Sequence, residues 1–511
     1  MVLKHLFLVC RSQTALFYFF IALQNLMGRR ATKFIALPGP LSLLSKLITS
    51  KMPSRPVKLE PLWRGLTYFD HQTAGIQKML ELERTGTLVP ELGDQPERTV
   101  YGGFQCDDMG LGKTIQILAT MKHNPKMQTL ILCPLALIDN WTDNAIKAGF
   151  RVFVKSREGW LEHEDAWGDG PDVYVANYET VLSRFEMLDA EGWNRIVLDE
   201  AHVIRSYKSK KTELVLKLAE RAKIKWAVTG TPIVNTQKDA VTLFAFVGVP
   251  TVPTMTWLSA YYQPLINEMV IHRSMEEMRA VLKSCPPKPI IDRRIIAFKD
   301  AKEEAFYREI QGLKSRFEFA YKTGDDESIL TTLLRLKQSS VTPQLLDPDW
   351  KKSSSKMDAL KECIDEEPDH KFIIFCSFIE EMEILSEFLE TTCELYHGGL
   401  TGLERREVLK RAKKEDCQVL LIQLQSGGVG LNLQEFDRVV FMSPWWTSAL
   451  MDQAIARAVR MGQTEQVHVI HFLLKEEDSV NIDTMANKAA ELKRDMLVKF
   501  FEHRCLMPEV H

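Results

Sequence analysis

Residues 107–114 read Asp-Asp-Met-Gly-Leu-Gly-Lys-Thr and lead into a periodic apolar segment, 115–121, that is typical of a helix. A loop of this kind can turn backbone N–H groups toward a phosphate, and the helix N-terminus adds partial positive charge. We expect Lys113 to reach the β- and γ-phosphates of a nucleotide and the Thr114 hydroxyl to take one position around Mg²⁺. The rest of the loop would surround the phosphates: Asp107, Asp108, Met109, Gly110, Leu111 and Gly112. Because Asp107 replaces the usual first glycine, the loop alone also fits an ordinary turn before a core helix.

A second segment, 195–202, is an apolar run that ends in two carboxylates, Asp199 and Glu200. Ligands of parallel sheets bind at the carboxyl ends of the strands, so both side chains are expected beside the phosphate loop. One carboxylate, Asp199, would hold Mg²⁺ through water, and the other would orient the attacking water.

Two further segments complete the set. Residues 226–232 run from an apolar strand into a hydroxyl-rich turn, and this turn suits a sensor that couples the nucleotide to a moving surface through Thr229, Gly230 and Thr231. Residues 453–463 place Arg457 and Arg460 three apart, which predicts one face of a helix. Arginine can neutralise the charge that builds on a transferring phosphoryl group, an effect worth about 10³–10⁵ in rate.

In this order, the segments resemble the SWI/SNF family of helicase-like ATPases within helicase superfamily two. The likeness covers roughly residues 66–475 and rests on DDMGLGKT, LILCPLALIDNW, VANYET, DEAH, TGTP, SGGVGLNL and QAIARAVRMGQ. An aspartate at the position of Asp107 is usual in that family. The resemblance implies that Gln72 reads adenine, although an exposed polar residue at a helix start is the alternative, and that Gln453 also contacts the nucleotide. ATP and Mg²⁺ are the cofactors it implies.

Composition agrees with a soluble, globular chain of about three domains: 45% of the 511 residues are hydrophobic and 26% are charged. None of the nine cysteines forms a Cys-x-x-Cys pair, which disfavours a zinc module and favours a reducing compartment. The first 59 residues hold nine basic residues and no acidic one, so the remainder carries 56 basic and 68 acidic residues. Any nucleic-acid groove must therefore be a local basic stripe.

The acid-free leader, 1–59, has three interpretations. Its apolar stretches are split by polar residues, whereas a membrane span needs about 20 mostly apolar residues. Its composition also resembles an organellar transit peptide. Alternatively, translation begins at Met52 and the leader is an artefact of gene prediction.

Short apolar runs alternate with helical periods along the chain, which predicts an α/β fold with parallel sheets. The predicted strands are 129–133, 173–178, 196–198 and 226–229, and then 372–376, 419–423, 439–442 and 467–473. With the resemblance, they imply two tandem RecA-like lobes with helical insertions between them. We therefore expect an ATP-binding lobe at 60–250, a helical protrusion or linker at 251–355, a C-terminal lobe at 356–485 and a helical tail at 486–511.

Nucleic-acid contacts are expected on loops at the other rim of the cleft, since glycines and hydroxyls let backbone N–H groups approach phosphates. The resemblance points to Pro134, Asn177, Tyr178, Thr180, Ser426, Gly427 and Gly428, and to the loop 397–399. Trp445 and Trp446 either stack on a base or pack in the core.

The segment 441–446 looks most like the branch that holds the helicase-like transcription factor and the RING-bearing repair translocases, but the RING cysteines are absent. The first functional hypothesis is an ATP-dependent translocase on double-stranded DNA that remodels nucleoprotein, nucleosomes among them, as a monomer or recruited subunit without a membrane partner. The alternatives are a strand-separating DNA or RNA helicase and an ATP-gated DNA-binding scaffold without turnover. A nuclear location follows from likeness only; a mitochondrion or a viral or host cytoplasm are the alternatives.

Overall fold

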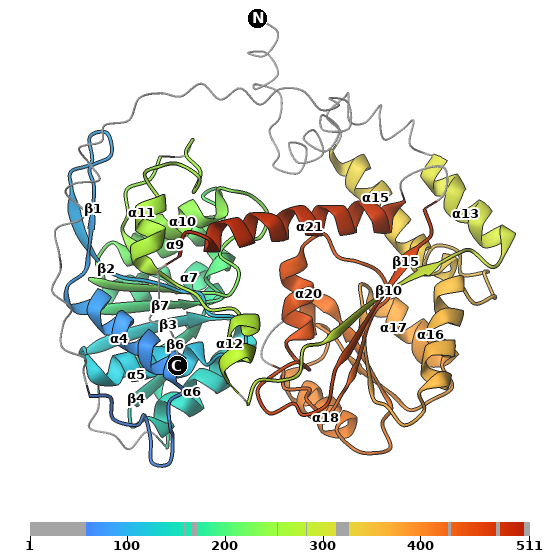
Figure 1. The fold of residues 1–511 in the computed structure, drawn as a ribbon, viewed down its shortest axis with the longest axis horizontal. Helices are drawn as coiled ribbons and strands as arrows, with labels where there is room; N and C mark the ends of the chain where they lie inside the picture. The colour runs from blue at the N-terminus through green and yellow to red at the C-terminus, as the bar shows by residue number, and fades with distance from the viewer. Residues whose placement is uncertain are drawn as a thin grey trace, which may run out of the picture. The chain divides into compact units, whose positions relative to one another are not determined.

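The computed structural model of the chain describes residues 58–156, 159–165, 171–252, 254–282, 284–312, 326–427, 431–476 and 481–504. Apart from its last two residues, the predicted leader lies outside this part of the chain. The described residues divide into a larger unit, drawn from 56–297 and 355–511, and a smaller unit drawn from 298–354. Figure 1 shows the larger unit as two sheets, each flanked by helices.

The first sheet has the strand order β1-β2-β8-β7-β3-β6-β4-β5, and β9 also pairs with β2. Only the two edge hairpins, β1 with β2 and β4 with β5, are antiparallel. The strands are β1 Thr87–Val89, β2 Arg98–Gln105, β3 Gln128–Cys133, β4 Arg151–Lys155, β5 Trp160–Glu162, β6 Asp172–Asn177, β7 Arg195–Asp199, β8 Ile224–Val228 and β9 Val270–Ile271. All four predicted strands of this lobe are present, and each begins or ends within two residues of its predicted bounds.

The central strands of this sheet are buried on both sides because helices cover both faces, as parallel sheets require. One face packs on α7–α11 and the other on α4–α6, and each face forms its own apolar cluster (Figure 1). The helices are α4 Asp70–Arg84, α5 Lys113–His123, η1 Leu135–Leu137, α6 Ile138–Lys147, α7 Tyr178–Ser183, α8 Phe185–Ala190, η2 Ala201–Ile204, α9 Lys210–Ala219, α10 Asp239–Val247, α11 Gln263–Met269 and α12 Met275–Val281.

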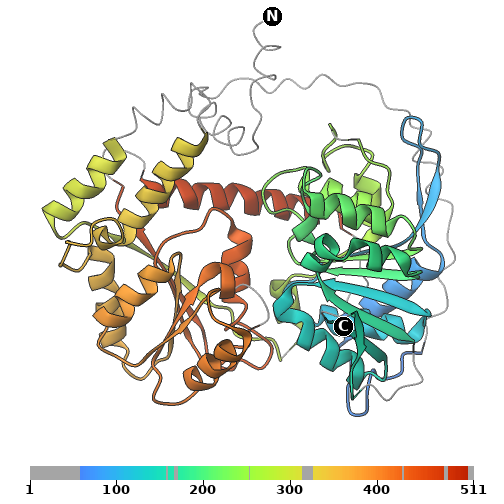
Figure 2. The same ribbon diagram turned by 180° about the vertical axis from the view of Figure 1, so that it is seen from behind.

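The second sheet is parallel throughout, in the order β10-β15-β14-β11-β13-β12. Its strands are β10 Ile290–Ile296, β11 Phe372–Cys376, β12 Cys393–Tyr396, β13 Val419–Gln423, β14 Arg438–Phe441 and β15 His468–Leu474. Helices α18 and α20 pack on one face, and Figure 2 shows α16 and α17 on the other side. The helices are α16 Ser355–Glu366, α17 Ile379–Phe388, α18 Gly402–Ala412, α19 Leu424–Gly427, α20 Ser448–Ile455 and α21 Ile482–Phe501. The predicted α/β class with two parallel sheets is confirmed.

The segment between the predicted lobes differs from the expected helical linker. Strand β9 extends the first sheet past residue 250, and β10 adds an edge strand to the second sheet. Helix α21 runs unbroken through the predicted boundary at 485. Its middle packs on the second sheet through Ala490, while Phe500 and Phe501 enter the core of the first (Figures 1 and 2). The expected linker therefore contributes strands β9 and β10 to the two sheets, and α21 contacts both lobes.

The smaller unit contains α13 Ala301–Gly312, α15 Asp326–Val341 and η3 Pro343–Leu345. Tyr307 and Val341 are buried within it, and Lys352 forms an ion pair with Asp300 at 2.5 Å. Throughout the part of the chain that the structure describes, none of the helices combines the length and apolarity needed to cross a lipid bilayer.

Candidate nucleotide-binding site

The phosphate loop connects the end of β2, at Gln105, to the start of α5, at Lys113. Gly112 is the N-cap of α5 and has a φ of 81°, in the left-handed region that favours glycine. A β-carbon at this position would lie 2.4 Å from the Gln72 side-chain nitrogen. Both the backbone conformation and the space around it therefore require glycine at 112.

Helix α4 holds the loop from one side. The backbone carbonyl of Leu111 lies 3.1 Å from His71 Nε2 and accepts hydrogen bonds from Gln72 Nε2 at 3.3 Å and Gln116 Nε2 at 3.4 Å. Gln72 also caps its own helix, because its Oε1 accepts the Phe69 N–H at 3.1 Å. Gln72 is only 7% exposed, which corrects the alternative of an exposed helix-start residue. The structure thus places Gln72 directly against the loop.

The aspartate that replaces the first loop glycine is fully buried. The Asp107 carboxylate accepts bonds from Gln105 Nε2 at 3.1 Å and Gln116 Nε2 at 2.9 Å, and it pairs with Arg273 at 3.2 Å. A buried carboxylate is tolerated when it is paired and hydrogen-bonded, and Asp107 is both. Asp107 therefore ties the loop to the segment that follows β9.

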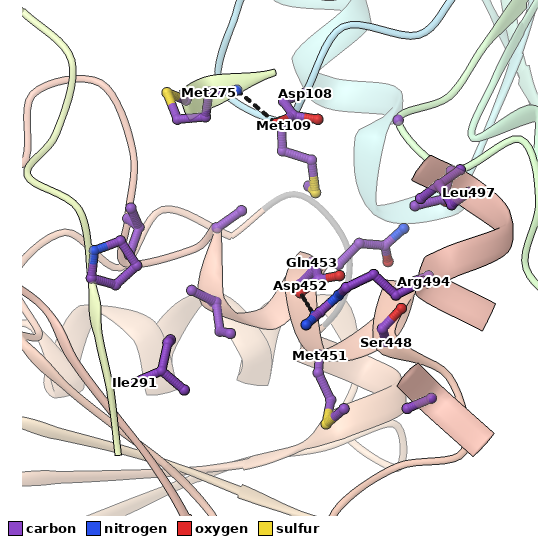
Figure 3. Close-up of a pocket in the computed structure, with 18 of the residues that line it drawn as sticks. Asp108, Met109, Met275, Ile291, Ser448, Met451, Asp452, Gln453, Arg494 and Leu497 are labelled. Atoms are coloured by element: carbon purple, nitrogen blue, oxygen red, sulfur yellow. Dashed lines mark hydrogen bonds and ion pairs between the residues drawn. The ribbon is translucent and has the colours of Figure 1, made fainter. Parts of the chain in front are cut away.

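The neighbouring Asp108 is tied to the same segment. Its carboxylate accepts the Met275 N–H at 2.7 Å, and its own N–H donates to the Arg273 carbonyl at 2.9 Å (Figure 3). Burial raises the pKa of Asp108, but the bonds from His272 and Met275 outweigh it, so the net pKa is below the ordinary value. Asp108 is thus held as an anion by structural partners.

Lys113 lies inside the loop. Its Nζ donates to the carbonyls of Asp107 at 2.7 Å and Asp108 at 3.3 Å. Thr114, the next residue of α5, is half-buried at the same helix start. Because these two acceptors are neutral carbonyls, the ammonium can shift to a phosphate, and the arrangement fits the predicted role.

The carboxylate pair lies at the end of β7, as predicted. Asp199 Oδ2 accepts the indole N–H of Trp141 at 2.8 Å. Glu200 has a φ of 50°, an uncommon value for a residue other than glycine. Burial and the nearby charge of Glu200 raise the pKa of Asp199. The hydrogen bond from Trp141 and the charge of Lys113 oppose this rise. Burial also raises the pKa of Glu200, which Lys113 and Arg457 oppose.

The turn at 229–231 lies against both the loop and the carboxylates. His202 Nδ1 is 3.0 Å from Thr229 Oγ1, 3.4 Å from Thr231 Oγ1 and 3.4 Å from Glu200 Oε2. A β-carbon on Gly230 would lie 3.9 Å from Lys113 Nζ. Burial lowers the pKa of His202 to about 4, so the ring is neutral near pH 7. Two of the predicted coupling residues, Thr229 and Thr231, are therefore linked to Glu200 through His202.

The two arginines do not lie on a helix, which corrects the sequence prediction. Helix α20 ends at Ile455, and Arg457 and Arg460 follow in a turn that is anchored where the Leu433 N–H donates to the Arg457 carbonyl at 3.1 Å. Arg457 is 5% exposed. Burial lowers its pKa to about 10, and Glu200 is the first charge that opposes this shift. Arg460 has a lowered pKa through burial and donates to the Leu431 carbonyl at 3.4 Å.

A cavity of about 730 Å³ adjoins this site. Asp108, Met109, Glu200, Gly230 and Thr231 line one side of it. The opposite side comes from β10, α20 and α21 and includes Gln453 of α20. Asp452 on the same helix forms an ion pair with Arg494 of α21 at 2.5 Å (Figure 3). The structure thus brings Gln453 to the same space as the phosphate loop.

The predicted nucleic-acid residues differ in their exposure. Tyr178 is 4% exposed and its hydroxyl donates to the Asp199 carbonyl at 2.7 Å, so its side chain supports the acidic pair. Asn177 caps α7, since its Oδ1 accepts the Thr180 N–H and hydroxyl, both at 3.0 Å. The side chains of Tyr178 and Asn177 are therefore both hydrogen-bonded within the first lobe.

The remaining candidates lie at loops. Pro134 is half-buried beside Leu135, which is 69% exposed. Ser426 and the Gly398 N–H share one acceptor, Gln423 Oε1, at 2.8 and 3.0 Å, which joins two predicted loops of the second lobe. Gly427 ends α19, and Gly428 lies outside the described residues.

Three site residues, Trp141, His202 and Arg273, were not predicted as such from the sequence. Each contacts its partner across a long stretch of chain: Trp141 contacts Asp199, His202 contacts Thr229, and Arg273 contacts Asp107. His202 belongs to the DEAH segment, and Trp141 ends the segment LILCPLALIDNW, so their motifs gave the one available hint.

A phosphate loop and an acidic pair at the carboxyl edge of one parallel sheet, followed by a second parallel sheet, define a two-lobed α/β nucleotide-binding protein. The chain belongs to the SNF2-related family: the SNF2-related domain matches residues 71–345, and the helicase conserved C-terminal domain matches residues 355–462. The resemblance to the SWI/SNF helicase-like ATPases is confirmed.

Individual relatives are distant. A protein of Orgyia pseudotsugata multicapsid polyhedrosis virus, described as a probable global transactivator, is 27% identical over 80% of this chain and 87% of its own length. DNA repair protein RAD5 of Yarrowia lipolytica is 23% identical over 82% of this chain and 57% of its own. Relatives from Bacillus subtilis and two Mycoplasma species are also longer, and the chain spans 41 to 51% of their length. The SWI2/SNF2 ATPase core of Sulfolobus solfataricus in complex with double-stranded DNA aligns with 88% of this chain and 99% of that core, at 23% identity and a TM-score of 0.36.

Proposed function

We propose that this chain is a DNA-dependent ATPase that hydrolyses ATP to step along double-stranded DNA and so displaces or remodels proteins bound there. The observation that supports it most is electrostatic: Arg457, from the turn after α20, stabilises the charged form of Glu200 at the end of β7. A charge partner supplied across the two lobes is what a site needs if hydrolysis depends on their approach.

The residues present fit ATP and Mg²⁺. Lys113 already spans two loop carbonyls, and Asp199 offers a buried carboxylate oxygen next to it. Thr114 and Asp199 would hold Mg²⁺, the latter through water, and Gln72 and Gln453 would contact the nucleotide. When bound, Mg²⁺ would neutralise negative charge on the phosphates. Hard oxygen ligands such as these are the ones Mg²⁺ prefers.

The protein's own residues then divide the work. Lys113 would bind the phosphates, Glu200 would orient the attacking water and take its proton, and Arg457 with Arg460 would neutralise charge on the phosphoryl group. Burial raises the pKa of Glu200 toward the working pH. A general base is most effective when its pKa lies near that pH. His202 connects Glu200 to Thr229 and Thr231, so a change at the acidic pair reaches the turn at 229–231.

Each cycle would change the relative position of two DNA grips. ATP can drive the lobes together only if ATP binds the closed arrangement of the two lobes better than ADP does. Backbone N–H groups around Pro134, and at the joined loops of Ser426 and Gly398, are the proposed grips, since phosphate contacts position DNA without reading sequence. The resemblance to SWI/SNF ATPases makes nucleosomes a proposed target and the nucleus a proposed location, and the relative described as DNA repair protein RAD5 supports a role on DNA.

The test is the rate of phosphate release by the purified chain with no nucleic acid, single-stranded DNA, double-stranded DNA, RNA and nucleosomes. The proposal predicts stimulation by double-stranded DNA that Lys113→Ala and Glu200→Gln abolish. A forked duplex should stay annealed; efficient release of a strand would instead favour a strand-separating helicase. Absence of turnover in the native protein, with Glu200→Gln binding DNA equally well, would favour an ATP-gated scaffold.

A further inference from the structure

Lys493, in the middle of α21, forms hydrogen bonds to two loop segments, one from each lobe. Its Nζ donates to the side-chain oxygen of Asn235 at 3.1 Å and to the backbone carbonyl of Trp446 at 2.8 Å. The residue is 7% exposed, although lysine is among the residues least often buried. Neither acceptor is an anion, so the contact does not serve as an ordinary surface ion pair.

The first partner, Asn235, belongs to a loop with little freedom. The Asp239 carboxylate accepts the N–H groups of Val234, Asn235 and Thr236 at 3.0, 2.6 and 3.2 Å. This loop continues directly from the turn at 229–231, whose Gly230 faces Lys113. Asn235 and the turn beside the phosphate loop therefore lie on one continuous segment, which the Asp239 carboxylate holds in place.

The second partner, Trp446, stands immediately before α20, which carries Gln453 and leads into the turn with Arg457. Further bonds fix α21 to the second sheet: the Asp483 carboxylate accepts from buried Lys356 at 2.7 Å and from the Leu474 N–H at 2.9 Å. Lys493 therefore approaches Asn235 from a helix whose start is anchored in the second lobe.

Charged side chains from neighbouring elements act on the Lys493 ammonium in opposite directions. Asp239 on α10 favours the ammonium, whereas Arg205, which follows η2, opposes it. Burial is the largest effect, and the pKa of Lys493 falls to about 8. The ammonium is thus the main form at pH 7 but is lost over the next two pH units.

We infer that Lys493 is a positioning residue that sets the spacing between the turn at 229–231 and helix α20, and through it the approach of Arg457 to Glu200. The inference rests on the proposed function, because it assigns Lys493 a role in the turnover of that site. The bonds to Asn235 and Trp446 act on the segments that carry the site, so the role assigned to Lys493 is one of positioning.

The test uses three variants of the full chain: Lys493→Met, which keeps the length and removes the charge; Lys493→Arg, which keeps the charge; and Lys488→Met, on the exposed face of the same helix. With double-stranded DNA present, Lys493→Met should lower kcat at least about tenfold while the affinity for ATP changes less than about twofold. Lys493→Arg should restore most of kcat, and Lys488→Met should behave as the native chain.

The pH profile separates positioning from simple stability. The native kcat should fall as the pH rises through about 8, because the ammonium is lost, whereas Lys493→Arg should show no such fall since arginine stays charged. A native profile identical to that of Lys493→Arg, or a normal kcat in Lys493→Met, would overturn the inference. The inference would also be overturned if circular dichroism showed that Lys493→Met is unfolded and that Lys493→Arg is unfolded as well.

A readout without turnover distinguishes failure of this inference from failure of the proposed function. Small-angle X-ray scattering without nucleotide should give a broader distribution of interatomic distances for Lys493→Met than for the native chain and Lys488→Met. If the native chain lacks ATPase activity but this broadening is seen, the proposed function fails while the role of Lys493 in spacing the lobes stands. Unchanged scattering together with unchanged kcat removes the inference alone.

Discussion

The indole N–H of Trp141, from α6, donates to Asp199 Oδ2 at 2.8 Å, and both residues are buried. This bond fixes one oxygen of the acidic pair and leaves the other to accept the Glu200 N–H at 3.0 Å. It also stabilises the charged form of a carboxylate whose pKa burial raises.

Replacing Trp141 by phenylalanine should therefore weaken the site without unfolding it. The lost bond raises the pKa of Asp199 further, and loss of such supporting bonds costs about 10- to 100-fold in metal affinity. The measurement is the Mg²⁺ concentration that gives half-maximal ATP hydrolysis. Trp193→Phe is the matched control, because Trp193 is also buried and donates to the Leu188 carbonyl at 2.7 Å, away from the site. Equal Mg²⁺ requirements in both variants would show that the Trp141 bond has no functional role.

The acidic pair predicts a pH dependence of its own. Burial and the charge of Glu200 raise the pKa of Asp199 above its ordinary 3.8, so Asp199 takes up a proton at a less acidic pH than an isolated aspartate does. Since the ionised form is needed, kcat/KM should fall as the pH is lowered from 7 toward 5, while circular dichroism shows an intact fold. In Trp141→Phe this fall should begin at a higher pH. A flat profile down to pH 5 would contradict the assignment of Asp199.

The phosphate loop predicts a difference between two glycines with similar backbone angles. Gly112→Ala places a β-carbon 2.4 Å from Gln72 at a φ of 81°, whereas Gly65, at 87°, has no atom within 4 Å of that position. Both changes carry a backbone cost of about 1–2 kcal/mol. Only Gly112→Ala should weaken ATP binding, by about tenfold or more as measured by calorimetry. Equal binding in the two variants would show that the contact with Gln72 is unimportant.

The core of the first lobe predicts a large loss of stability at one buried ion pair. Arg195 pairs with Glu83 at 2.6 Å, with 1% and 0% of the side chains exposed, and Trp226 and Asn124 also donate to Glu83. Arg195→Met leaves the Glu83 charge buried without its partner, which costs about 3–5 kcal/mol in the free energy of unfolding. Arg151→Met, at the exposed pair with Glu162, should leave the urea midpoint close to native. A similar small effect in both variants would contradict the importance of the buried pair.

The sequence was enough to predict the two parallel sheets, because continuous apolar runs such as 372–376 and 419–423 are buried on both faces and need no tertiary information. Strand β10 escaped prediction since its alternating exposure reflects an edge position that only the sheet order defines. Motif order located Lys113, Asp199 and Glu200, but the partners Trp141 and Arg273 are tertiary contacts. Arg457 was assigned to a helix because its spacing allows one, yet the chain turns after Ile455.

In the proposed mechanism, hydrolysis needs Arg457 from the second lobe beside Glu200 from the first. The most direct measurement is kcat for ATP with saturating double-stranded DNA in Arg457→Gln, together with the Kd for ATP in the same variant. We expect a fall in kcat of about 10³-fold or more with a Kd within a few-fold of native. A native kcat in Arg457→Gln would contradict it.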